Sequence, residues 1–99
     1  MPDATHATIA TFSMDPERFD QQREGLHRMI VPSVRSSPGF VSGTWTLDRE
    51  TNESVVLVAF ESPADAEAFA GNVEDNAPHQ VAVGIELQSI RVVEISAIA

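Results

Sequence analysis

The residues best suited to chemistry are a histidine late in the chain and an arginine early in it. His79 follows Pro78 at the expected start of a short helical segment, and an imidazole can act as a base, an acid or a ligand near neutral pH. Arg23 falls between Ile30 and Val34 around a helix, inside an otherwise apolar stripe. Its guanidinium must therefore reach the edge of the stripe or meet an anion in a cavity. The alternatives are that His79 is an ordinary surface histidine and that Arg23 only lies at the margin of the apolar stripe.

Three further residues are candidate ligand contacts. His27 lies one turn beyond Arg23 on the same flank, so the two side chains could line one wall. Trp45 is the single tryptophan of the chain and could stack on a planar molecule. A buried Trp side chain, which covers ~200 Å², more often fills a core or an interface. Phe69 lies on the apolar face of a second predicted helix and either packs in the core or contacts the ligand.

The first elements that must position these residues have clear sequence signals. Residues 5–14 are rich in β-branched side chains and are predicted to form a strand. Asp15 is an expected N-cap, with Pro16 at the first helical position, for a helix over about 16–36. Pro32 should bend this helix or convert its last turn.

A proline and a glycine reverse the chain after this helix. Pro38 cannot continue the helix and Gly39 permits a tight turn, so the chain runs back as a strand through Trp45. A polar hairpin loop over 48–53 leads to a strand that ends at Phe60.

The second helix begins at a capping box in Ser62-Pro63-Ala64-Asp65. Asn76-Ala77-Pro78 should restart a short helix that ends at Gly84, before a last strand at about 89–98. The order is then β-α-β-β-α-β, which is the ferredoxin-like α+β arrangement with a four-stranded antiparallel sheet, in a single domain over residues 1–99.

Composition excludes several classes of function. The formal net charge is −9 with a pI of about 4.5, which argues against nucleic acid or an anionic membrane as a partner. The chain has no Cys and no Tyr, and all its cationic side chains are Arg, so thiolate, tyrosyl and lysine chemistry are excluded. Three histidines without tight spacing predict no metal site. With neither a signal-peptide pattern nor a long apolar run, the expected location is the cytoplasm.

The third strand favours assembly into a homodimer. Val55 to Phe60 is a run of six apolar residues, whereas a strand with one wet face should alternate. Two helices can cover only one face of the sheet, and a second copy of the same sheet is the simplest cover for the other. A central strand in a monomer that tolerates exposed aliphatic side chains is the alternative.

Over nearly its whole length the sequence resembles the dimeric α+β barrel superfamily, in its antibiotic biosynthesis monooxygenase-like branch. The segments that resemble it are Pro38-Gly39-Phe40 with Gly43, Phe60-Glu61-Ser62 followed by Asp65-Ala66 and Phe69, and Ser89-Ile90-Arg91-Val92-Val93-Glu94. The resemblance implies two sheets paired face to face into a barrel, with a pocket between sheet and helices in each subunit. Some members oxidise polycyclic aromatic molecules without metal or flavin, others cleave haem, and others act on small catabolites.

Compared residue by residue, this match is incomplete. Haem-degrading members have an aromatic residue early in the second helix, a histidine ten residues later and an asparagine on the first strand. Phe69 and His79 match the first two, but Ile9, Ala10 and Thr11 occupy the candidate places for the third. Aromatic-oxidising members use Asn, Trp, Arg and Tyr, whereas this chain lacks Tyr and carries its Trp on the second strand.

The resulting hypothesis is a monooxygenase without a cofactor that acts on a small, apolar, aromatic molecule. His79 would be the base and Arg23 the cation that stabilises the developing oxyanion, while His27, Trp45 and Phe69 would contact the ligand. Two alternatives stay open: a non-catalytic ligand-binding or assembly module of the same fold, and a haem-binding protein that uses His79.

Overall fold

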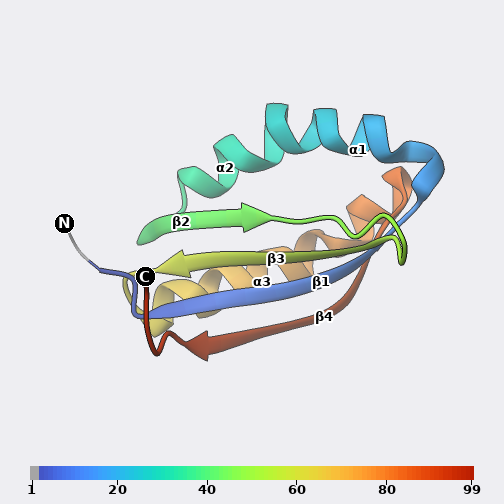
Figure 1. Ribbon diagram of the computed structural model, residues 1–99. Helices are drawn as coiled ribbons and strands as arrows, with labels where there is room; N and C mark the ends of the chain where they lie inside the picture. Colours follow the sequence, from blue (N-terminus) through green and yellow to red (C-terminus); the bar gives the residue numbers. More distant parts are fainter. Residues whose placement is uncertain (1–2) are drawn as a thin grey trace.

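The computed structural model describes residues 3–99 and confirms the predicted ferredoxin-like α+β order (Figure 1). The elements are β1 (His6–Met14), η1 (Pro16–Arg18), α1 (Phe19–Gly25), η2 (Leu26–Ile30), α2 (Val31–Arg35), β2 (Phe40–Trp45), β3 (Glu53–Phe60), α3 (Pro63–Gln80), η3 (Val81–Val83) and β4 (Ile85–Glu94). The strands form one antiparallel sheet in the order β2-β3-β1-β4.

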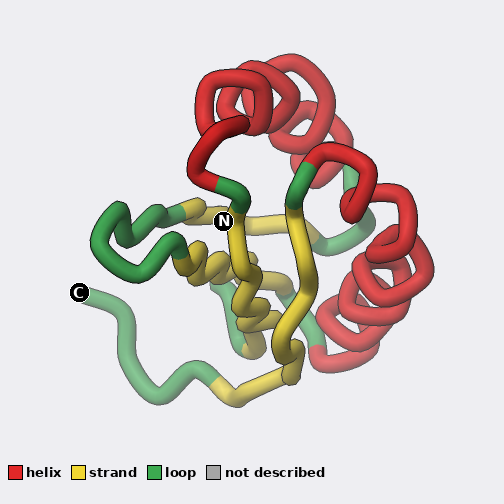
Figure 2. The backbone as a smooth tube through the Cα atoms, turned by 90° about the vertical axis from the view of Figure 1, so that its right-hand side faces the viewer, coloured by secondary structure: helices red, strands yellow, loops and turns green. Residues whose placement is uncertain are grey.

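The molecule has two layers, a sheet and a layer of helices on one of its faces. Figure 2 shows the helical segments on the same side of the sheet, with loops and strand ends on the other. Residues 16–35, here called the first helical segment, run above β2, and α3 lies behind the sheet in Figure 1. The opposite face of the sheet has no helix over it.

The first helical segment is a composite of four pieces rather than one regular helix. Asp15 caps it as expected, because its carboxylate accepts a hydrogen bond of 3.0 Å from the backbone N–H of Glu17. The middle piece, η2, is a π-helical turn that lies directly before Pro32. In a regular α-helix the ring of Pro32 would clash with the carbonyl of Arg28, and the wider turn relieves that clash. The distortion that Pro32 predicts is therefore present, but it precedes the proline.

The turn into β2 requires its glycine. Gly39 has φ +72°, in the left-handed region that a side chain disfavours. A Cβ there would also lie 2.1 Å from Oδ2 of Asp65. The turn between α2 and β2 therefore lies against the first turn of α3, with no room for a side chain at position 39.

Helix α3 packs closely on the sheet. Ser62 caps it by accepting a hydrogen bond from the backbone N–H of Asp65 at 3.2 Å, and its own hydroxyl donates to the Asp65 carboxylate at 2.9 Å. Ala66 and Ala70 are buried, and the small size of Ala66 lets the Thr8 hydroxyl of β1 donate to its carbonyl at 2.8 Å.

Two predicted boundaries at the end of the chain are wrong. Helix α3 does not restart at Pro78 but continues through it to Gln80. A proline in the last turn removes one hydrogen bond, and packing of α3 on β4 outweighs that loss. The last strand covers 85–94 instead of 89–98, because its pairing with β1 begins at Met14 and Ile85. The helical end at Gly84 is confirmed, with φ +78°.

The core lies between the sheet and the helices. Its most deeply buried large side chains are Phe60 and Val58, each at 0% exposure. In the single chain β3 alternates, because Val56, Val58 and Phe60 face the helices while Val55 and Leu57 are 39% and 40% exposed. On the outer face Ala59 and its cross-strand partner Ala7 are buried as well. The run of apolar residues therefore places aliphatic side chains on both faces of the sheet.

Candidate active site

A cavity of about 1080 Å³ lies between the sheet, the first helical segment and α3. It is at the upper end of the size range of small-molecule sites. All five residues singled out from the sequence line it: Arg23, His27, Trp45, Phe69 and His79. The cavity brings together residues from three elements that are separated by up to 56 positions in the chain.

One wall comes from the first helical segment. Arg23 is in α1 and His27 is in the π-helical turn η2, and both side chains are exposed. Leu26 and Ile30 line the same wall and supply its apolar part. Because Pro32 widens the helix here, the turn that carries His27 departs from regular α-helical geometry. π-turns of this kind occur often at functional sites.

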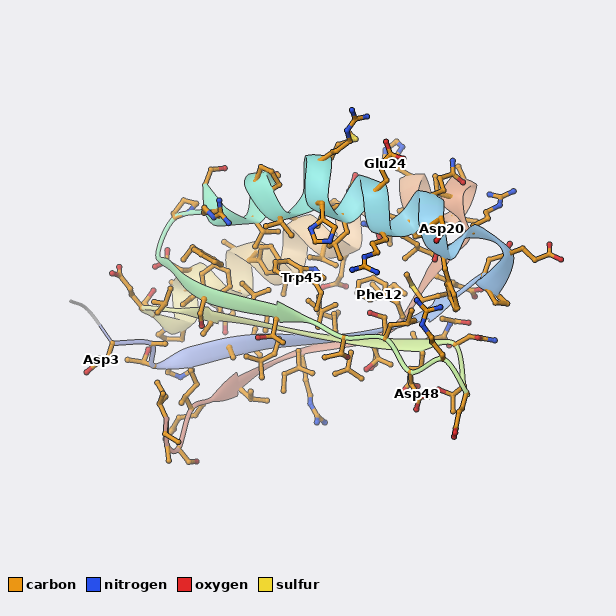
Figure 3. The ribbon with its side chains drawn as sticks, turned by 45° about the horizontal axis from the view of Figure 1, so that its top comes forward. Asp3, Phe12, Asp20, Glu24, Trp45 and Asp48 are labelled. Atoms are coloured by element: carbon orange, nitrogen blue, oxygen red, sulfur yellow. The ribbon has the colours of Figure 1, made fainter. Side chains whose placement is uncertain are left out.

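The floor comes from the sheet, where Trp45 is the largest side chain. Trp45 pairs with Val56 of β3, so its indole is on the helix-facing side. A Cβ on Gly43 would lie 2.9 Å from Cζ3 of the indole, which means that the ring extends back over this glycine. Trp45 and Phe12 both lie between the sheet and the first helical segment (Figure 3). The floor is therefore a flat aromatic surface that depends on glycine at position 43.

The opposite wall comes from one face of α3. Its lining residues recur at helical spacing: Phe69, Asn72, Val73, Asn76 and His79. Phe69 also packs on Phe60, with ring centroids 5.2 Å apart, so it belongs to both the core and the cavity. Sequence reasoning missed the two asparagines. The first strand lacks the amide found in haem-degrading members, but this wall offers amides one and two turns before His79 on average helical geometry.

A buried glutamine connects the two walls at one end of the cavity. Gln22 is 5% exposed, and its Nε2 donates to the carbonyls of Val83 at 3.0 Å and of Asp15 and Gly84 at 3.3 Å each. These carbonyls belong to the start of the first helical segment and to the turn after α3. Its Oε1 has no hydrogen-bond partner among residues 3–99. Gln22 was missed because a glutamine on a helix normally faces solvent.

Arg49, in the loop between β2 and β3, is the second missed residue. Its Cζ lies 5.3 Å from the centroid of the Phe19 ring, and both residues line the cavity. Nothing in the sequence around 48–53 distinguishes this arginine from an ordinary hairpin-loop residue. The contact joins the hairpin to the first turn of α1.

The lining contains both signs of charge. Arg23 and Arg49 carry positive charge, Asp20 and Asp75 carry negative charge, and His27 and His79 can take up protons. Within residues 3–99 no group of three or more His, Cys, Asp or Glu side chains has the arrangement of a metal site. Among the helices of residues 3–99, none combines the length and apolar character needed to cross a membrane.

Three solved structures are similar to the chain over most of its length. A monooxygenase from the gene ActVA-Orf6 of Streptomyces coelicolor, in complex with nanaomycin D, has a TM-score of 0.64 and 19% identity and covers 100% of this chain and 92% of its own. The haem degrader MhuD of Mycobacterium tuberculosis, with two haems in its active site, has a TM-score of 0.69 and 17% identity, with 95% and 98% covered. A proposed antibiotic biosynthesis monooxygenase from Deinococcus radiodurans has a TM-score of 0.66 and 11% identity, with 95% and 93% covered.

These similarities define a class of fold. The chain is a small ferredoxin-like protein with a cavity between its sheet and its helices. It shares its fold with these three solved structures, two of which are named as monooxygenases and one as a haem degrader. No protein-family model matches the sequence, and no curated protein does. At identities this low the likeness establishes the fold and leaves the chemistry to be argued from the cavity.

Proposed function

We propose that the protein is a monooxygenase that oxidises a small, apolar, aromatic molecule without a cofactor. The observation that carries this proposal is the convergence of Arg23, His27, Trp45, Phe69 and His79 on one cavity of about 1080 Å³. A flat aromatic floor suits a planar substrate, and a histidine on one wall with an arginine on the other suits removal of a proton with stabilisation of the resulting anion.

The reaction converts an activated CH₂ group and O₂ into a ketone and water. His79 removes a proton from the carbon between two aromatic rings, and Arg23 stabilises the anion that forms. This anion gives one electron to O₂, and the resulting radical and superoxide combine to form a carbon–oxygen bond. His79 returns its proton to the peroxide. Loss of the second C–H proton then breaks the O–O bond, and hydroxide leaves as water.

The test is oxygen uptake with a panel of hydroxylated polycyclic aromatic molecules that carry a CH₂ group between two aromatic rings. We expect wild-type protein to consume one O₂ per substrate and His79→Ala to be at least tenfold slower, because general-base catalysis typically contributes 10²- to 10⁴-fold. His6→Ala is the matched control, since His6 lies at the start of β1 and does not line the cavity. An unchanged rate in His79→Ala would exclude it as the base, and no uptake with any substrate would favour a non-catalytic binding module.

We further propose that two copies pair through the outer face of the sheet. Paired positions put Leu57 beside Ile9 and Ala59 beside Ala7 on this face, and Leu57 is 40% exposed. Exposed aliphatic side chains in adjacent rows favour burial against another apolar surface. Sedimentation should give a dimer that Leu57→Glu dissociates. Val81→Glu is the control, because Val81 is 59% exposed and belongs to η3 rather than to a strand of the sheet. A wild-type monomer at micromolar concentration would refute the pairing.

Haem binding is a second candidate, favoured by the position of His79 at the cavity ten residues after Phe69. The residues present fit the group in one respect: the exposed imidazole of His79 would hold the iron, and Arg23 and Arg49 would hold the propionates. Bound haem would supply iron for oxygen activation. Titration with haem should then give a Soret shift that is lost in His79→Ala, and the absence of a shift would remove this candidate.

A further inference from the structure

We propose that the ligand of the cavity carries one carboxylate on its planar body, and that Arg49 and Arg23 bind this group together. The inference deepens the proposed function, and it rests on that function for the premise that the cavity is a ligand site. It adds a substrate class, planar aromatic monocarboxylates, and a binding residue, Arg49.

Both arginines line the cavity, and Phe19 relates their positions to each other. Arg49 reaches from the hairpin between β2 and β3 to the ring of Phe19, with its Cζ 5.3 Å from the ring centroid. Arg23 is four positions beyond Phe19 in α1, so its side chain projects from the same face one turn away. All three residues line the cavity. From this spacing we infer that the loop cation and the helix cation lie close enough to share one group of a ligand.

Two arginines of residues 3–99 have acidic partners, whereas Arg23 and Arg49, like Arg35 and Arg91 outside the cavity, have none. Arg18 pairs with Asp15 at 3.7 Å, and Arg28 pairs with Glu24 at 3.1 Å. Within residues 3–99 no carboxylate lies within 4.0 Å of the guanidinium of Arg23 or Arg49. In a chain with a formal net charge of −9, two cations side by side without acids repel each other. An anion between them would relieve that repulsion.

The rest of the lining limits the charge of this anion to one. Asp20 is next to Phe19 in α1, and Asp75 is on the wall that α3 forms, so two carboxylates also face the ligand space. Their repulsion would offset much of the attraction for a dianion such as a phosphate monoester. A carboxylate matches the planar fork of a guanidinium and adds only one charge.

The distance between this charged end and the aromatic floor gives the ligand an orientation. Trp45 and Phe12 supply the flat surface, and the arginines lie where the hairpin meets α1. A planar ligand would stack on the floor with its carboxylate toward Arg49. In this orientation Arg49 is the main partner of the carboxylate, and Arg23 lies between that group and the part of the ligand that His79 deprotonates.

The experiment compares three probes of nearly equal shape by isothermal titration calorimetry: 2-naphthoate, neutral 2-naphthamide and cationic 2-naphthylmethylammonium. We expect wild-type protein to bind the carboxylate at least tenfold more tightly than the amide, because charge-assisted hydrogen bonds are the stronger ones. In the double variant Arg23→Gln/Arg49→Gln the preference should fall to about threefold or less. The control is Arg28→Gln/Arg35→Gln, which removes the same charge from residues outside the cavity and should keep the preference.

Three results would overturn the inference: equal affinity for the carboxylate and the amide in wild-type protein, a preference that survives in the cavity double variant, or no binding of any probe. The wild-type comparison needs no variant, so a folding defect cannot obscure it. 2-Naphthoate has no activated CH₂ group, and the titration does not depend on oxygen. The titration can therefore be interpreted even if the protein shows no turnover. Equally, a failure to prefer the carboxylate would not affect the interpretation of the oxygen-uptake assay.

Discussion

The first helical segment and α3 cover the same face of the sheet but differ in how closely they approach it. Helix α3 presents Ala66 and Ala70 to the strands, and the hydroxyl of Thr8 reaches the Ala66 carbonyl at 2.8 Å. The first helical segment instead directs Arg23 and His27 toward the sheet, and a cavity of about 1080 Å³ separates it from the floor. Small side chains allow contact between backbones, whereas long polar ones keep the layers apart and hydrated.

This difference separates stability from ligand binding within a chain of only 99 residues. Phe60, which packs on Phe69 of α3, is completely buried. The first helical segment buries Val34 and Gln22 but leaves its cavity-facing cations exposed. We therefore expect substitutions under α3 to affect folding and substitutions under the first helical segment to affect binding.

The largest expected effect is that of Phe60→Ala. Removing a fully buried Phe leaves a void at the contact with Phe69, and such changes lower the free energy of unfolding by about 3–5 kcal/mol. Urea denaturation followed by circular dichroism measures this. Phe19→Ala, at the rim of the cavity, should cost much less. Equal losses in the two variants would mean that the cavity side is as well packed as the α3 side.

The next largest effect is expected at Gly39, in the turn between α2 and β2. Gly39→Ala should lower the free energy of unfolding by about 1–2 kcal/mol or more, because φ is +72° and the new Cβ would meet the Asp65 side chain. The matched control is Gly71→Ala inside α3, where a Cβ would meet nothing within 4 Å. That change should raise stability by about 0.5–1 kcal/mol. Two changes of the same sign in thermal melts would contradict this assignment.

The smallest expected effect on folding is that of the cavity cations. Arg23→Gln and His27→Gln should each change the free energy of unfolding by less than about 0.5 kcal/mol, because both side chains are exposed and make no ion pair within residues 3–99. Urea titrations of the two single variants check this. A loss above 2 kcal/mol in either would assign the residue to the core instead of the site.

Local signals in the sequence predicted most of the fold and several site residues. The caps at Asp15 and Ser62 and the turn at Gly39 depend on residues that are neighbours in the chain, so their types suffice to locate them. The spacing of Arg23 and His27 on one helical face also requires only local geometry. These features were predicted because the interactions that determine them span four residues or fewer.

The missed features depend on partners far away in the chain. Gln22 donates to the carbonyl of Val83, 61 positions later, and Arg49 contacts Phe19 across the cavity. The start of β4 is fixed by pairing with Met14, which no propensity of residues 85–88 reveals. Pro78 remains helical because tertiary packing outweighs a local preference. Sequence patterns therefore located the walls of the cavity better than its ends.

The central claim is that a planar molecule binds beside Trp45 and leaves the core under α3 undisturbed. The chain has one tryptophan, so its indole N–H gives a single nuclear magnetic resonance signal, and the methyl groups of Val58 report on the core. Titration with neutral 2-naphthalenemethanol should shift the indole signal of Trp45 in a saturable way while the Val58 methyl signals stay in place. An indole signal that does not move, or one that moves only together with the Val58 methyl signals, would contradict binding of a planar molecule beside Trp45 with an undisturbed core.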